Sequence, residues 1–178
     1  MQRLADMFEP KTEEAAVHVH DMVEKGYFRK KDNVKFAELK TLNTKLSLLY
    51  EVREPTINVI GERVFAGGFG QYDPKEMEMF LKNYSVVTYL HEFRHHVQNL
   101  GSCSISEADA QGWACFVYYK ACPVLFVKAV ENNRIMGATI DGERIVLSVD
   151  NGFVDYKMLV CEDIQTAGGG LNEREVLI

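Results

Sequence analysis

The sequence lacks any long apolar run, and it has no surplus of basic residues. Its apolar stretches, such as VLFV at 124–127, are far shorter than the roughly 20 residues that a membrane-spanning helix needs. The formal net charge of the 178-residue chain is −6, which argues against a nucleic-acid interface, because such surfaces are basic. The amino end also lacks the apolar core of a signal peptide. We therefore expect a cytoplasmic protein that binds neither membrane nor nucleic acid.

Cysteine pairs of the C-x-x-C type are also absent. The chain has four cysteines, and none is spaced as in a zinc ribbon or a thioredoxin-like redox motif. Free thiols are the default in a reducing compartment. Internal repeats and low-complexity segments are missing as well, while 47% of the residues are hydrophobic. This composition predicts one domain with a sizeable core.

The hydrophobic periodicity predicts an α+β fold: a small mixed sheet, two central helices and a strand-rich carboxyl-terminal segment. Helices are expected at 12–25, 33–44, 85–100 and 107–122, with a further helical stretch to about 132. Strands are expected at 45–52, 56–61, 63–69 and 75–81, and a loop or bulge at the glycines 67, 68 and 70. Thr12 and Ser106 are expected to cap helices. Residues 1–133 form the expected core, and residues 134–178 form an extension, with turns at 141–142 and 151–152, that we assign to the same domain.

The stretch YLHEFRHHVQ at 89–98 contains three of the five histidines. His91 and His95 are four residues apart, so on a helix their imidazoles share one face, with about 5–6 Å between Cβ atoms. That spacing lets two nitrogens reach one Zn²⁺ at about 2.0–2.1 Å. Glu92 follows the first histidine and is turned away from the metal, where it can reach a water. The pattern predicts two zinc ligands and a general base.

A catalytic zinc site needs a third protein ligand and one open position. SISEADAQGWA at 104–114 places Glu107 in the first turn of the next helix, and we favour it as the third ligand. Asp109, on another side of that helix, is the rival, and Cys103 and His96 remain further alternatives. Gln111 lies one helical turn after Glu107 and is expected to hydrogen-bond the site from behind.

HEFRH followed by EADAQGWA resembles the gluzincins, zinc peptidases with two histidines and a downstream glutamate on a second helix. Small soluble branches, the minigluzincins and the ImmA/IrrE-type peptidases, are similar in style over about residues 45–125. The resemblance implies a small sheet, an active-site helix and a glutamate helix. It also implies that FAGGFGQYDPKEMEM at 65–79 holds an edge strand along which an extended peptide lies. A metzincin is excluded because no third histidine follows at the required spacing.

Together these observations predict a zinc metallopeptidase that acts on a peptide or protein substrate. Glu92 is the expected general base, and Tyr72 and Arg94 are candidates for stabilising the oxyanion. The alternative is a catalytically inactive protein of the same fold that serves as a binding or regulatory module. The sequence specifies neither the substrate nor the oligomeric state.

Overall fold

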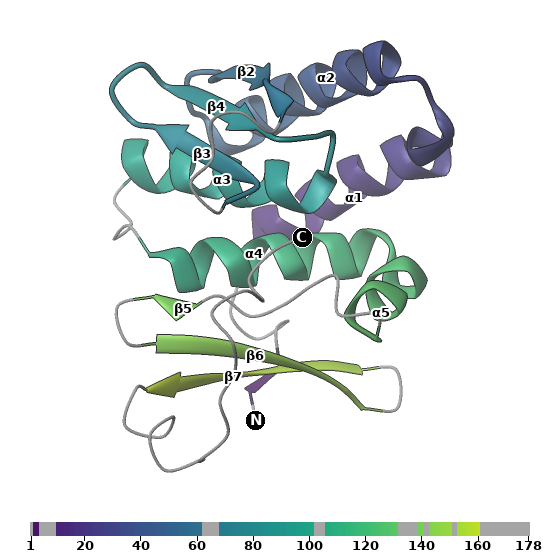
Figure 1. Ribbon diagram of the computed structural model, residues 1–178, viewed down its shortest axis with the longest axis vertical. Helices are drawn as coiled ribbons and strands as arrows, with labels where there is room; N and C mark the ends of the chain where they lie inside the picture. The colour runs from purple at the N-terminus through teal and green to yellow at the C-terminus, as the bar shows by residue number, and fades with distance from the viewer. Residues whose placement is uncertain are drawn as a thin grey trace.

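The computed structural model describes residues 2–3, 10–61, 68–101, 106–131, 139–140, 143–150 and 153–160. Over these residues the fold is α+β, as predicted, with five α-helices and a three-stranded mixed sheet in the part that carries the histidines. In Figure 1 the sheet lies above helix α3 (Val86–Leu100), and α3 lies above helix α4 (Glu107–Ala121). The two helices thus form the layers under the sheet.

The first helix, α1, spans Pro10–Glu24 and begins two residues earlier than predicted. Proline suits a first helical turn, where its missing N–H is not needed. Thr12 is therefore not the expected cap but a buried residue inside the helix. Ala15, Ala16 and Val19 continue the buried stripe at helical spacing.

The second helix, α2, spans Asp32–Tyr50 and corrects the predicted strand at 45–52. Its apolar residues keep the helical spacing past the predicted end, since Leu39, Leu42 and Leu46 are all buried. Leucine also favours helix over strand, where β-branched residues are preferred. The helix ends at Glu51, whose positive φ of 57° lets its N–H bond the carbonyls of the last turn. A short 3₁₀ turn, Tyr27–Arg29, precedes α2.

The three-stranded sheet has the order β2-β4-β3. Strand β2 (Thr56–Val59) is parallel to β4 (Glu78–Leu81), and β3 (Gly70–Asp73) is antiparallel to β4. The predicted strand at 63–69 falls mostly outside the described residues, and positions 68–69 are not in a strand. Gly70 begins β3, where a glycine loop or bulge was predicted. Residues 74–77 form a turn, so β4 is shorter than the predicted strand at 75–81.

Serine side chains cap both central helices, and the cap at Ser106 was predicted. The hydroxyl of Ser85 accepts a hydrogen bond from the Thr88 N–H, and that of Ser106 accepts one from the Asp109 N–H. Pro123 ends the run that starts at Glu107 and opens helix α5 (Pro123–Glu131).

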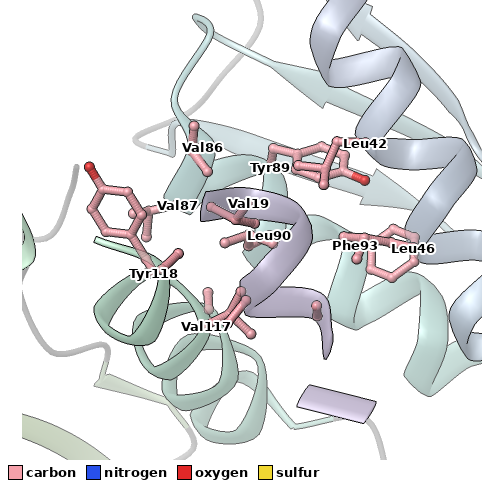
Figure 2. Packing of buried hydrophobic residues seen from close by; sticks show 14 of the residues in the cluster. Val19, Leu42, Leu46, Val86, Val87, Tyr89, Leu90, Phe93, Val117 and Tyr118 are labelled. Carbon is pink, nitrogen blue, oxygen red and sulfur yellow. The ribbon is translucent and has the colours of Figure 1, made fainter. Parts of the chain in front are cut away.

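One hydrophobic core joins the helices. Figure 2 shows side chains from α1, α2, α3 and α4 directed toward this common interior. Phe93 of α3 lies 6.1 Å from the ring of Tyr50 and 6.3 Å from that of Trp113, measured between centroids. The Trp113 N–H donates to the Tyr50 hydroxyl over 3.1 Å, so the buried indole keeps a polar partner. This aromatic cluster links α2, α3 and α4 directly beneath the histidine-bearing segment.

Three strands follow in the carboxyl-terminal segment: β5 (Thr139–Ile140), β6 (Glu143–Asp150) and β7 (Phe153–Val160). They pair antiparallel in sequence order, and β1 (Gln2–Arg3) pairs with β7. The predicted turns at 141–142 and 151–152 and the boundary at 133/134 lie outside the described residues. Within the described ranges, no helix combines the length and the apolar character required to cross a membrane.

A pair of leucines tests the helical assignment of residues 45–50. Leu46 is fully buried and Leu48 is 74% exposed, as expected for a helix, whereas a strand would place both on one face. Leu46→Ala should lower the free energy of unfolding by about 2–5 kcal/mol. Leu48→Ala should change it by less than about 0.5 kcal/mol. Urea denaturation measures both, and equal effects would contradict the helix.

Candidate metal centre

Helix α3 presents His91 and His95 on one face, one turn apart. Their Nε2 atoms are 3.1 Å apart, and their rings meet edge to face with centroids 4.7 Å apart. Neighbouring residues on the opposite side, Leu90 and Phe93, are buried in the core. Because the core fixes the rotation of α3, the two imidazoles are held in one direction.

Glu107 of α4 completes the cluster. Its Oε2 lies 3.0 Å from the Nε2 of His91, and its Oε1 lies 2.9 Å from the Nε2 of His95. The three ligating atoms lie within 4.8 Å of one another. Ser106 caps α4 immediately before Glu107, so the cap fixes where this carboxylate emerges. The structure therefore brings together the three residues that the sequence favoured as ligands.

Gln98 determines which nitrogen of His95 carries the proton. The amide Nε2 of Gln98 donates to the Ser106 carbonyl over 2.9 Å and to the Asp109 Oδ2 over 2.7 Å, and both partners can only accept. The Oε1 of Gln98 must then face the Nδ1 of His95, 3.0 Å away. Nδ1 is consequently the donor, and the lone pair of neutral His95 is on Nε2, toward Glu107.

His91 is supported in the same way from α4. Its Nδ1 lies 3.0 Å from the Oε1 of Gln111, as the predicted supporting role of that glutamine requires. The Gln111 amide nitrogen donates to the Sγ of Cys115 over 3.5 Å. Each histidine is therefore held from behind by a glutamine oxygen, which leaves both Nε2 lone pairs directed at one point. Such outer hydrogen bonds orient metal-binding histidines.

The electrostatics of the cluster favour a shared positive charge, which either protons or a metal ion can supply. Two lone pairs 3.1 Å apart beside a carboxylate repel one another unless a positive charge is shared between them. When the Nε2 atoms of His91 and His95 carry protons instead, their hydrogen bonds to Glu107 hold the pKa of that carboxyl far below its usual range, so it stays ionised. Burial lowers the pKa of His95, but the hydrogen bond and charge of Glu107 outweigh burial and leave it above its ordinary value.

The donor set fits Zn²⁺. Two imidazole nitrogens and one carboxylate are ordinary zinc ligands, and a catalytic site has three protein ligands and one open position. Two ligand atoms around a tetrahedral Zn²⁺ stand about 3.3 Å apart, given bonds of about 2.0 Å. The separations of 2.9–3.1 Å in the cluster are within a few tenths of an ångström of that value. Small side-chain movements therefore suffice to admit the ion.

Glu92 lies beside the cluster and outside its ligand set. Its side chain is buried, on the side of α3 that faces β3. Burial raises the pKa of Glu92; His91 and His95 lower it in part, and Glu107 raises it further. A carboxylate with a raised pKa takes up a proton more readily, as a general base must.

The alternative third ligands are engaged elsewhere. Asp109 accepts two hydrogen bonds from Arg94, of 2.7 and 3.1 Å, and one from Gln98, so its carboxylate is used between the two helices. His96 is fully buried, with Nε2 2.6 Å from the Arg53 carbonyl. Cys103 lies outside the described residues.

Both candidates for the oxyanion role have other partners in the structure. Arg94 is bound by Asp109 and lies 5.7 Å from the Trp113 ring centroid. The Tyr72 hydroxyl lies 2.9 Å from the Nδ1 of His96. Sequence reasoning also missed Gln98, although its position three residues after His95 placed it within reach on the same helix.

Comparison of the chain with protein-family models, with curated proteins and with solved structures finds no match. The resemblance to gluzincins therefore rests on the two short motifs alone.

Replacing each of the two carboxylates of α4 by alanine, one at a time, tests the ligand set. Glu107→Ala should abolish stoichiometric zinc binding, because it removes one of three ligands. Asp109→Ala should keep zinc affinity within about 100-fold of the wild type. It should instead lower the unfolding free energy by about 2 kcal/mol or more, because it leaves the buried Arg94 without this carboxylate. Zinc titration and denaturation measure the two effects, and the reverse order would identify Asp109 as the ligand.

Gln98→Met removes the group that orients His95 while keeping a similar side-chain volume. Zinc affinity should fall by about 10–100-fold, the usual effect of losing such a hydrogen bond. Gln71→Met, at an exposed glutamine of β3, is the matched control and should leave the affinity unchanged. Unchanged affinity in folded Gln98→Met would show that the amide does not support the site.

Proposed function

We propose that this protein is a zinc-dependent peptidase. The observation that carries the proposal is the convergence of the two Nε2 atoms and the Glu107 carboxylate, with both imidazoles oriented from behind by glutamines. Glu92, next to this cluster, supplies the general base that accompanies the three ligands. A helix that merely contains histidines has no need of this arrangement.

The roles of the side chains follow from their positions. His91, His95 and Glu107 would hold Zn²⁺, which when bound polarises the scissile carbonyl and lowers the pKa of water. A carboxylate oxygen of Glu92 accepts a proton from the attacking water and delivers it to the leaving amine nitrogen. The burial that raises the pKa of Glu92 favours its uptake of that proton. We assign the oxyanion role to neither Tyr72 nor Arg94.

A peptide or protein substrate is supported by the position of β3. In the described sheet order, β2-β4-β3, this strand lies at an edge, as the resemblance to gluzincins implies. Figure 1 shows β3 next to α3, the helix that bears the histidines. An extended peptide can add to an exposed strand edge through main-chain hydrogen bonds. Such a peptide would lie close to Glu92.

Glu92→Gln separates catalysis from metal binding. The variant keeps the side-chain size but removes the base, so peptide cleavage should fall by about 100-fold or more while zinc content stays at about one per chain. Mass spectrometry of a peptide library incubated with the zinc-loaded protein measures cleavage, and metal analysis measures zinc.

Three results would contradict the assignment in different ways. Zinc loss in folded Glu92→Gln would place Glu92 among the ligands. Cleavage unchanged in the variant would remove its role as base. A zinc-loaded wild type that cleaves no peptide would favour the binding or regulatory module.

A further inference from the structure

Strand β3 follows a stripe of residues on α3 that the metal cluster does not use. Gly70 lies against Thr88 and Glu92, while Tyr72, two residues later, lies against His96 and Asn99. Two strand residues advance about 6.8 Å, and four helical residues advance about 6 Å. The two periods nearly match, so Gly70 pairs with one turn of α3 and Tyr72 with the next.

Gly70 has no room for a side chain. A Cβ placed there would lie 2.5 Å from the Oε1 of Glu92, 2.8 Å from its Cγ and 2.8 Å from the Cγ2 of Thr88. Real Cβ atoms essentially never approach other heavy atoms this closely. The space that a side chain would fill is occupied by Glu92.

Tyr72 is hydrogen-bonded to α3, and the chemistry of its partners fixes which group donates in each bond. The Nε2 of His96 must donate to the Arg53 carbonyl, 2.6 Å away, because a carbonyl only accepts. With Nε2 as its donor, the imidazole has an acceptor at Nδ1, which lies 2.9 Å from the Tyr72 hydroxyl and accepts its proton. The amide of Asn99 donates to the same hydroxyl over 3.2 Å. The hydroxyl is therefore both a donor and an acceptor in its contacts with α3.

We propose that Gly70 and Tyr72 are positioning residues for Glu92. Tyr72 fixes the register of β3 along α3, and the missing side chain at position 70 leaves the space in which the Glu92 carboxylate is held. This inference rests on the proposed function for its catalytic consequence, but the contact between Gly70 and Glu92 can be tested without activity. The residues that place the base thus come from the strand as well as from the HExxH helix.

A double-mutant cycle tests the contact. Gly70→Ala should lower the urea midpoint in the wild-type background, and Glu92→Ala should reduce that shift by about half or more, because contacting residues couple. The part of the midpoint shift that remains comes from the contact with Thr88. Gln71→Ala, on the opposite face of the same strand, should shift the midpoint equally in both backgrounds. Additive effects of Gly70→Ala and Glu92→Ala would overturn the inference.

An NMR signal of Glu92 reports its environment directly. It also tests the inference if Gly70→Ala fails to fold. The carboxyl carbon-13 signal of Glu92, identified by its absence in Glu92→Gln, should shift in Tyr72→Phe. Tyr119 lies twelve residues after Glu107 on α4, a helical rise of about 18 Å, so Tyr119→Phe should leave the signal in place. An unmoved signal in Tyr72→Phe would overturn the positioning role.

The catalytic consequence is measured on the zinc-loaded protein. Tyr72→Phe and Gly70→Ala should lower kcat by about 10-fold or more, with KM and zinc content unchanged, because small displacements of a catalytic group reduce rates steeply. Tyr119→Phe should keep kcat. Unchanged kcat in both positioning variants would overturn the inference. If the zinc-loaded wild type cleaved no peptide, the proposed function would be wrong. The double-mutant cycle and the carbon-13 signal would still show whether Gly70 and Tyr72 position Glu92.

Discussion

The candidate site depends on one side-chain amide, that of Gln98. It bonds the Ser106 carbonyl and the Asp109 carboxylate at the start of α4, and its oxygen faces His95 on α3. One group thereby fixes both the tautomer of a candidate ligand and the position of the helix end that carries Glu107. The amide has a single orientation that satisfies all these partners, so the direction of the His95 lone pair follows from hydrogen-bond chemistry.

Arg94 and Asp109 strengthen the same junction. Their paired hydrogen bonds join α3 and α4 next to Gln98, and the guanidinium also lies over Trp113. A largely buried guanidinium is costly to desolvate unless such contacts are complete. The pair is therefore better understood as fixing how the helices meet than as a net source of stability. Asp109 looked like a rival ligand in the sequence because both acidic residues lie in the first turn of α4, and only the packing of the two helices separates their roles.

Local signals in the sequence predicted the parts of the fold that local chemistry determines. Ser106 caps α4 as predicted, α3 begins next to Ser85 where a helix was expected, and the spacing of His91 and His95 predicted their shared face. The segment at 45–52 was misassigned because four consecutive apolar or small residues read equally well as a strand, and its burial on α2 decides the matter. Other features depend on contacts between distant segments. Tyr72 and His96 are 24 positions apart, and no spacing rule connects a residue on β3 with one on α3.

The two carboxylates of the site show why these distant contacts matter. Glu107 lies between two imidazoles, which hold its pKa far down and keep it ionised for a cation. Glu92 lies on α3, on the side that is buried against β3, and desolvation there raises its pKa. Environments that push two carboxyl pKa values apart assign different tasks to chemically identical groups. Here one environment is made by α3 and α4 together, and the other by α3 and β3. The division of labour that we propose between ligand and base thus depends on placing α3 between two partners, a placement that the HExxH motif alone does not encode.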